Sequence, residues 1–211
     1  MLEVRDLSFS ADDPARSLFR GLAFALAPGE ALALTGPPDS GKSVLVRILV
    51  GAIRAYAGQV VFQGKELGDW SRDFFELTGA VLDPAGLAPQ LTSLEILECQ
   101  ARLYRGGNPG AARGALDRVG LAAASRTRAV KLESDQRFLV ALARAQLHRP
   151  ILLCVDTPAE GLSPAASDRL DDAIRARKAE GLATVVAARD GAWVAALCGR
   201  ALRLDGEGAD A

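Results

Sequence analysis

The sequence predicts an α/β fold with a mostly parallel sheet as its core, an antiparallel β layer near the start of the chain and an inserted helical part in the middle. Two observations support this prediction. In the last third of the chain, short apolar strands alternate with helical segments, as in parallel sheets whose strands are joined by crossover helices. Residues 91–147 show helical periodicity almost throughout, whereas residues 2–64 contain mainly short apolar runs separated by turns.

The expected elements follow from these patterns in chain order. The first part predicts strands at residues 2–9, 22–27, 30–36 and 58–64, with a helix at 43–53. The middle part predicts helices within 91–104, 112–121 and 134–148. The last part predicts strands at 151–156, 183–188 and 200–205 and helices at 165–181 and 192–199. Because no linker or repeat divides the chain, residues 1–211 are expected to form a single domain, with a helical subdomain at roughly 84–147 within it.

The chain of 211 residues carries a net charge of −1, with Lys and Arg matched by Asp and Glu along its length. This balance does not favour a nucleic-acid partner, because such a partner usually selects for a basic face. No apolar stretch approaches the roughly 18 residues that span a bilayer, and the first residues lack the pattern of a signal peptide. We therefore expect a cytoplasmic protein whose three isolated cysteines are reduced thiols. The single histidine, His148, is expected at the surface or at a helix end, just before Pro150.

The most specific motif is GPPDSGKS at Gly36–Ser43, which matches the phosphate-loop pattern G-x-x-x-x-G-K-[ST]. It follows an apolar strand and opens an apolar helix, as phosphate binding by backbone N–H groups and a helix N-terminus requires. The alternative is an ordinary Gly-rich turn, which would not need a Lys-Ser pair where the helix begins. Lys42 is expected to bridge the β- and γ-phosphates of ATP, and the Ser43 hydroxyl to ligate Mg²⁺. The residues expected to bind the nucleotide are Gly36, Pro37, Pro38, Asp39, Ser40, Gly41, Lys42, Ser43 and Val44.

A single acid, Asp156, ends the apolar strand expected at 151–156. A carboxylate at the end of a buried strand, far downstream of a phosphate loop, is typical of a group that orients Mg²⁺, here together with Ser43. A plain strand-end Asp that caps a turn is the alternative, and the long apolar run before the acid makes that alternative weaker. The strand, the loop and the acid together predict a P-loop NTPase core of the RecA-like type.

Taken in order, these segments resemble the nucleotide-binding subunit of ABC transporters over essentially the whole chain. Residues 24–43 (FALAPGEALALTGPPDSGKS) resemble the strand, turn and Walker A motif of that family, and residues 149–164 (RPILLCVDTPAEGLSP) resemble its Walker B motif and D-loop. Residues 77–97 have the register of its Q-loop, and residues 129–150 take the place of its signature segment and helix. The resemblance implies ATP and Mg²⁺ as cofactors. As partners it implies transmembrane permease subunits and a second ABC subunit, with a peripheral position on the inner face of the cell membrane.

Several family motifs are altered in this chain. The signature, L-S-G-G-Q in the family, reads Leu-Glu-Ser-Asp-Gln at residues 132–136, and the Glu that follows the Walker B Asp is replaced by Thr157. The switch His corresponds to Arg189, the Q-loop Gln to Asp83 and the D-loop Asp to Ser163. The resemblance therefore implies a degenerate member of the family.

The altered signature changes the charge that a helix start presents. In the family, the signature of one subunit contacts the γ-phosphate that the opposite subunit holds. The carboxylates of Glu133 and Asp135 would outweigh the partial charge of about +0.5 at a helix N-terminus, so the segment would repel a triphosphate. Its alternative role is structural, as a helix N-cap formed by Ser134 or Asp135. We expect that the capping role is kept and that anion binding is lost.

The catalytic positions also lack their usual chemistry. Thr157 has no basic group near neutral pH, and a positioned general base typically contributes about 10²- to 10⁴-fold in rate. Glu160 is the one nearby carboxylate that could replace it, but it lies past Pro158, where the chain has turned. Arg189 can bind phosphate oxygens but cannot relay a proton. Asp83 would add negative charge near the metal, or it is a solvated loop acid.

These substitutions predict a subunit that binds Mg-ATP through its phosphate loop, hydrolyses it weakly or not at all, and couples its nucleotide state to separate transmembrane subunits. Two alternatives stay open. The chain can be a catalytically silent, nucleotide-gated scaffold or regulatory protein. It can also be a working transport ATPase that uses unusual groups such as Glu160 and Arg189.

Overall fold

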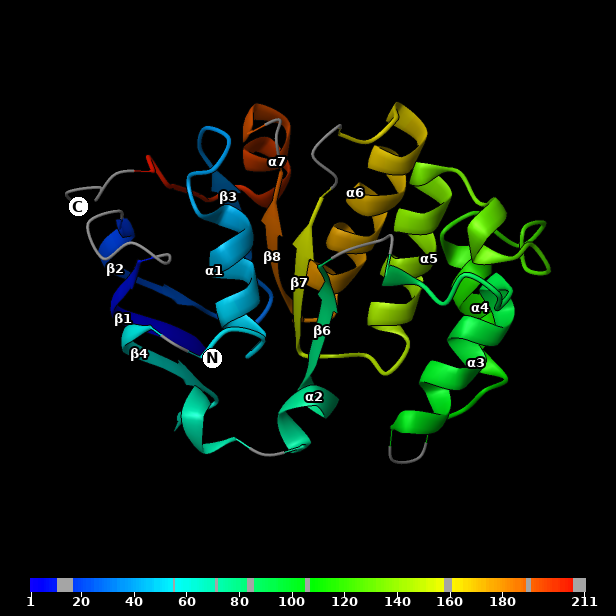
Figure 1. Ribbon diagram of the computed structural model, residues 1–211, viewed down its shortest axis with the longest axis horizontal. Coiled ribbons are helices and arrows are strands. Elements are labelled where there is room, and N and C mark those ends of the chain that lie inside the picture. The colour runs from blue at the N-terminus through cyan, green and yellow to red at the C-terminus, as the bar shows by residue number, and fades with distance from the viewer. Residues whose placement is uncertain are drawn as a thin grey trace.

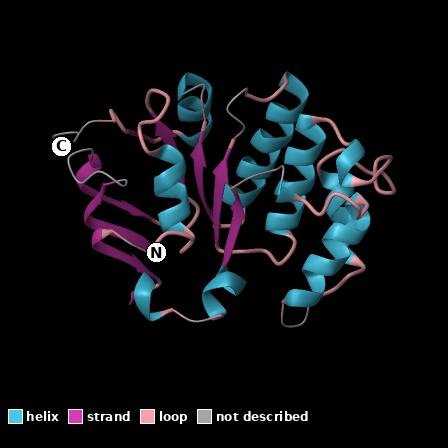
Figure 2. Cartoon of the chain, in the orientation of Figure 1, coloured by secondary structure: helices cyan, strands magenta, loops and turns pink. Residues whose placement is uncertain are grey.

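The computed structural model describes residues 1–10, 17–54, 56–70, 72–82, 86–104, 107–157, 161–188 and 191–206. Figure 1 shows one sheet at the left of the view and a second at the centre, with helix α1 (Lys42–Leu49) between them. Helices also cover the opposite side of the central sheet, and the helical part of the chain extends to the right (Figures 1 and 2). The layers therefore follow the order outer sheet, α1, central sheet and the remaining helices.

The central sheet has five strands, all parallel, in the order β6-β7-β8-β3-β9. Their bounds are β3 (Ala31–Thr35), β6 (Thr78–Val81), β7 (Leu152–Asp156), β8 (Ala183–Ala187) and β9 (Ala201–Arg203). Because the strands are parallel, their carboxyl ends share one edge of the sheet, and the loops that follow β3 and β7 both begin there. The predicted α/β class with a mostly parallel core is confirmed.

The outer sheet is antiparallel and has the order β2-β1-β4-β5. Its strands are β1 (Leu2–Ser10), β2 (Ser17–Leu26), β4 (Ala57–Phe62) and β5 (Lys65–Glu66). Leu2 of β1 lies opposite Leu26 on one side and Phe62 on the other, so three buried side chains meet where the strands pair. This sheet is the antiparallel layer that the early apolar runs predict.

Side chains alternate along the central strands between two cores. On β7, Leu152 and Cys154 pack with α1 and the outer sheet, whereas Leu153 and Val155 pack with the helices on the opposite face. All four side chains are fully buried, because both faces of the sheet are covered. This double burial explains why the central strands read as continuous apolar runs in the sequence rather than as alternating ones.

Among the remaining helices, α3 and α6 have clear start signals where the chain enters them. The α-helices are α2 (Asp73–Leu77), α3 (Ser93–Leu103), α4 (Ala111–Arg118), α5 (Ser134–Gln146), α6 (Pro164–Ala179) and α7 (Gly191–Cys198), with 3₁₀ turns η1 (Leu67–Asp69) and η3 (Ala129–Lys131). Thr92 and Glu95 form a capping box at the start of α3, in which the Thr92 N–H donates to Glu95 at 2.8 Å. Ser163 caps α6 by accepting from the N–H of Ala166 at 3.3 Å, and Pro164 occupies the first helical position. None of the helices in the described ranges is long and apolar enough to cross a membrane.

Five short elements in the described ranges have no counterpart among the predicted ones, namely β5, β6, the five-residue helix α2 and the turns η1 and η3. The strand β6, with the sequence TGAV, is too short to show a period and contains a glycine, which weakens any strand signal. His148 follows the end of α5, as expected, but its ring is half-buried and stacks on Tyr104 with ring centroids 3.8 Å apart. Its Nε2 lies 3.0 Å from the carbonyl oxygen of Thr78, so the side chain joins the helical part to β6.

Candidate nucleotide site

The predicted phosphate loop lies between β3 and α1, and its two glycines have conformations that other residues rarely adopt. Gly36 has φ of +135°, and a Cβ atom there would collide with the carbonyl oxygen of Leu204. Gly41 has φ of +92° and is the N-cap of α1. Both positions require glycine because of backbone conformation, and Gly36 also because of the close approach of the chain after β9.

Lys42, the first residue of α1, folds back over this loop. Its Nζ donates to the carbonyl oxygens of Gly36 at 3.0 Å and Pro37 at 2.6 Å, and to the Ser40 hydroxyl at 3.1 Å. Burial lowers the pKa of Lys42, while the nearby carboxylates of Asp156 and Asp39 act in the opposite direction. The ammonium group is therefore fixed at the mouth of the loop and flanked by two acids.

Asp156 meets the same loop from the end of β7. One strand, β8, separates β7 from β3, and α1 crosses that gap to pack on β7, which brings Ser43 to the carboxylate. A side-chain hydrogen bond links Ser43 and Asp156. Burial raises the pKa of the Asp156 carboxyl, and the Ser43 hydrogen bond and the charges of Arg47 and Lys42 partly offset this effect.

These groups fit a nucleotide phosphate and a magnesium ion. The α1 N-terminus has no side-chain cap, so its first N–H groups and its positive dipole end face the loop. The hydroxyl of Ser43 and the carboxylate of Asp156 are oxygen ligands of the kind that Mg²⁺ prefers. Lys42 adds a fixed positive charge. The chemistry of the donors therefore agrees with the cofactors that the sequence predicts.

Some of the other predicted site residues lie within the described part of the chain, and some lie outside it. Pro37, Pro38 and Asp39 are exposed at the tip of the loop, and Val44 is half-buried against the core between the two sheets. Thr157, directly after β7, is half-buried, and its N–H donates to the carbonyl oxygen of Ala187 at 2.9 Å. Asp83, Glu160 and Arg189 lie outside the described residues, so their roles stay predictions.

The signature segment is a helix N-cap, but the capping residue is not one of those predicted. We expected Ser134 or Asp135 to cap the helix; the structure instead places Glu133 at the N-cap of α5, in a capping box with Gln136. The helix begins one residue earlier than a Ser134 cap would allow and two residues earlier than an Asp135 cap would allow. Asp135 lies in the first turn, where its carboxylate accepts a hydrogen bond from the N–H of Ser163 at 3.3 Å. The sequence gives no sign of this contact between the starts of α5 and α6.

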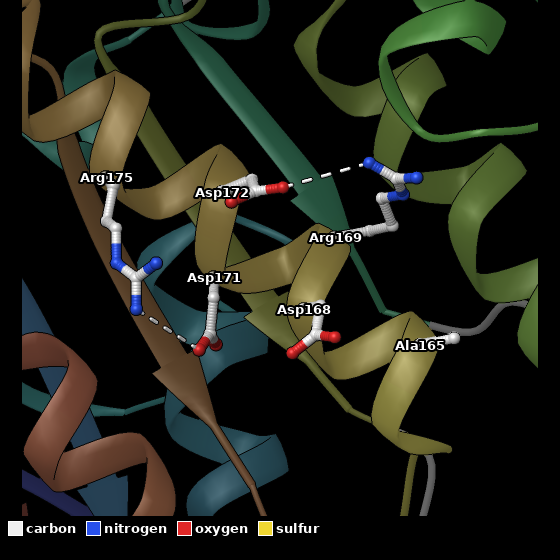
Figure 3. A pocket seen from close by; sticks show the side chains of 6 residues that line it. All are labelled: Ala165, Asp168, Arg169, Asp171, Asp172 and Arg175. Atoms are coloured by element: carbon white, nitrogen blue, oxygen red, sulfur yellow. Dashed lines mark ion pairs between the residues drawn. The ribbon is translucent and has the colours of Figure 1, made fainter.

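A shallow groove runs along the solvent side of α6 and includes none of the predicted nucleotide residues. Figure 3 shows the side chains that line it, all from this helix: Ala165, Asp168, Arg169, Asp171, Asp172 and Arg175. Two ion pairs cross it, Arg169 with Asp172 at 3.8 Å and Arg175 with Asp171 at 3.7 Å. Such exposed pairs contribute little to stability. The groove is therefore a charged face of α6 on which both arginines form ion pairs with acids of the same helix.

The phosphate loop joins the parallel strand β3 to helix α1. The carboxylate of Asp156, at the end of β7, is hydrogen-bonded to Ser43 at the start of that helix. This combination defines the class of P-loop nucleotide-binding domains. A sequence model of the ABC transporter family matches residues 19–160. The chain therefore belongs to the ABC transporter family and is an ATP-binding domain of it.

Two curated relatives are similar over most of the chain. A fluoroquinolones export ATP-binding protein of Mycobacterium tuberculosis (strain CDC 1551 / Oshkosh) is 31% identical over 200 residues, which cover 95% of this chain and 66% of that protein. The cytochrome c biogenesis ATP-binding export protein CcmA of Shigella dysenteriae serotype 1 is 35% identical over 170 residues, covering 81% of this chain and 80% of that protein. The chain thus spans slightly less than two thirds of the first relative.

Solved structures share the fold at lower sequence identity. The dimeric, post-hydrolysis state of the ATP-binding cassette MJ0796, bound to ADP and phosphate, superposes with a TM-score of 0.87 at 21% identity, covering 100% of this chain and 97% of that one. The structure of cbiO1 from Clostridium perfringens has a TM-score of 0.80 at 23% identity, covering 97% and 84%. These likenesses establish the P-loop NTPase fold of an ABC cassette.

Proposed function

We propose that this chain is the ATP-binding subunit of an ABC transporter, and that it binds Mg-ATP through residues 36–44 but hydrolyses it weakly or not at all. One contrast at the end of β7 carries the proposal. Asp156 is hydrogen-bonded to Ser43 beside Lys42, whereas the next residue, Thr157, has no basic side chain. The groups suited to binding are present, and the expected proton acceptor is replaced.

In this proposal Ser43 and Asp156 would hold Mg²⁺, which when bound supplies positive charge to the phosphates. The other contributions come from the chain itself. Lys42 provides a fixed positive charge, and the N–H groups at the start of α1 bind phosphate oxygens. Gly36 and Gly41 allow the backbone to approach the phosphates closely.

Weak hydrolysis follows from several substitutions acting together. Thr157 cannot accept a proton from an attacking water, which removes a contribution of about 10²- to 10⁴-fold in rate. At the start of α5, Glu133 and Asp135 place two acids where the family presents a hydroxyl and backbone N–H groups to the partner's γ-phosphate. We propose that Arg189 holds phosphate without relaying a proton, that Asp83 adds unfavourable charge near the metal, and that Glu160 does not replace the missing base.

We further propose that residues 1–211 act as one nucleotide-binding domain with a helical subdomain at roughly 84–147. Its partners would be transmembrane permease subunits at the inner face of the cell membrane and a second ABC subunit, identical or different. The names of the relatives as export ATP-binding proteins support a transport role, and the dimeric form of a cassette with the same fold supports pairing.

The test is to measure Mg-ATP binding and steady-state ATP turnover on the purified chain, alone and with its membrane partner. We expect binding that is lost in Lys42→Ala, with turnover at least about 100-fold below that of an ordinary transporter, as the loss of a general base predicts. Fast turnover that disappears in Lys42→Ala would show a working transport ATPase. No Mg-ATP binding at all would overturn the proposal and its nucleotide-gated scaffold alternative together.

A further inference from the structure

Asp39 stands in the middle of the phosphate loop in a backbone conformation that favours glycine. Its φ is +60°, in the left-handed region, which Asp and Asn tolerate better than most residues but which only glycine enters without cost. The two residues before it, Pro37 and Pro38, have no backbone N–H to offer a phosphate. At the point where the loop turns, it therefore carries a side chain with a negative charge.

The carboxylate of Asp39 is exposed and shares its surroundings with the loop's own cation. Lys42 Nζ is hydrogen-bonded to Gly36, Pro37 and Ser40, and the charge of Asp39 acts on it. Phosphates that enter the loop bring their negative charge toward the same ammonium group. Asp39 and a bound phosphate thus compete for one positive charge, and they also repel each other directly.

From this geometry we infer that Asp39 is an affinity-determining residue, whose carboxylate weakens binding in proportion to the negative charge of the nucleotide's phosphates. This inference rests on the proposed binding of ATP at residues 36–44. In surroundings close to water, two unit charges about 8 Å apart change each other's binding by roughly twofold. With Mg²⁺ bound, ATP carries a net charge of about −2 and ADP about −1, so the effect is larger for Mg-ATP than for Mg-ADP.

The test compares three chains, the natural one, Asp39→Asn and Asp39→Gly, in equilibrium binding of Mg-ATP and Mg-ADP by calorimetry. Asn keeps the tolerance for a positive φ and removes the charge, whereas Gly also removes the backbone strain. Asp69→Asn is the control, because Asp69 is an exposed acid in η1, outside the phosphate loop. Thermal unfolding of each chain verifies that the fold is retained.

We expect Asp39→Asn to bind Mg-ATP roughly three- to sixfold more tightly than the natural chain at low salt, with a smaller gain for ADP. The gain should shrink between about 0.02 M and 0.5 M salt, since screening acts on the charge and not on the conformation. Any extra gain in Asp39→Gly should not depend on salt.

Equal affinities of the natural chain and Asp39→Asn at low salt would overturn the inference and leave Asp39 with a purely conformational role. A gain that is the same for Mg-ATP and Mg-ADP would overturn it as well. If the natural chain fails to bind and Asp39→Asn binds, the inference is supported while the proposed function of the natural chain fails. If none of the three chains binds ATP, both are overturned.

Discussion

The carboxylate of Asp156 is subject to opposing effects within a few ångströms. Burial at the end of β7 disfavours its charged form, while the Ser43 hydrogen bond and the charges of Arg47 and Lys42 favour it. Burial has the larger effect, so the pKa lies above the ordinary value of 3.8. As the pH rises through that raised pKa, the folded protein loses a proton that the unfolded chain has already lost. The stability of the fold therefore decreases over this range.

Replacing Asp156 by Asn should stabilise the nucleotide-free protein at neutral pH, because the amide keeps an acceptor for Ser43 without a buried charge. We expect the melting temperature at pH 7.5 to rise by about 2–4 °C, the shift that roughly 1 kcal/mol gives in a domain of this size. The gain should vanish as the pH falls below the raised pKa. The same variant should lose the part of ATP binding that depends on Mg²⁺. A lower melting temperature at pH 7.5, with Asp69→Asn unchanged, would contradict this account.

At this scale the sequence predicts some features of the site and not others. The spacing of Gly36, Gly41 and Lys42 predicts the loop because it stands between an apolar strand and an apolar helix, the context that phosphate binding requires. The bond between Asp135 and Ser163 joins residues 28 positions apart, and it depends on where α5 and α6 begin relative to each other. The positive φ of Asp39 cannot be predicted from the sequence either, since Asp is equally common in turns where its φ is negative.

Between elements, a helix and a strand approach each other closely at Gly79 of β6. A Cβ atom there would collide with the carbonyl oxygen of Ala145 in α5, and it would lie 2.8 Å from Cγ of Pro150. The absence of a side chain at this position lets α5 lie directly on the edge strand of the central sheet. The backbone of α5 cannot move away easily, because its Phe138 and Leu142 side chains are fully buried.

Gly79→Ala should therefore destabilise the fold, although alanine is a conservative change in most strands. Overpacking of this kind costs about 2 kcal/mol, which corresponds to a fall in melting temperature of roughly 4–8 °C. Gly68→Ala is the matched control, since a Cβ at Gly68 meets nothing within 4 Å. Its melting temperature should stay unchanged or rise slightly. Equal effects of the two substitutions would mean that α5 can shift away from β6.

The same strand shows the limits of prediction at this scale. The long, apolar β7 and β8 are predicted within one residue at either end, because burial on both faces leaves continuous apolar runs. The four residues of β6 carry too little pattern to be recognised. Their strand conformation comes from pairing with β7, in which Thr78 lies opposite Leu152 and Val81 opposite Val155. Tertiary pairing, and not local preference, forms this edge of the sheet.

For the molecule as a whole, the altered positions fall on two different surfaces of the proposed dimer. Thr157 follows β7, next to the chain's own phosphate loop, whereas Glu133 and Asp135 begin α5. In the family arrangement, one ATP contacts the phosphate loop of one subunit and the signature of the other. If two copies of this chain pair, each of the two sites has both defects. Restoring the family residues at only one of these two places therefore leaves each site with the other defect.

This arrangement predicts how reversals combine in a dimer of identical chains. Thr157→Glu alone restores a base, but the acids of the opposing signature still repel the γ-phosphate. The changes Glu133→Ser, Ser134→Gly and Asp135→Gly restore the signature but leave the base absent. We expect each change alone to raise ATP turnover by less than about tenfold, and the two together by about 10²- to 10⁴-fold.

Steady-state ATP turnover of the four chains at saturating Mg-ATP measures this, with Lys42→Ala in the chain that carries both changes as the control for contaminating activity. Size-exclusion chromatography with ATP then tests the mechanism, because the restored signature should promote dimer formation whether or not Thr157 is replaced. Full recovery by Thr157→Glu alone would show that Glu133 and Asp135 do not weaken the opposing site. Recovery that requires a different ABC subunit would instead favour a heterodimer, in which each reversal repairs a separate site and the two gains add rather than multiply.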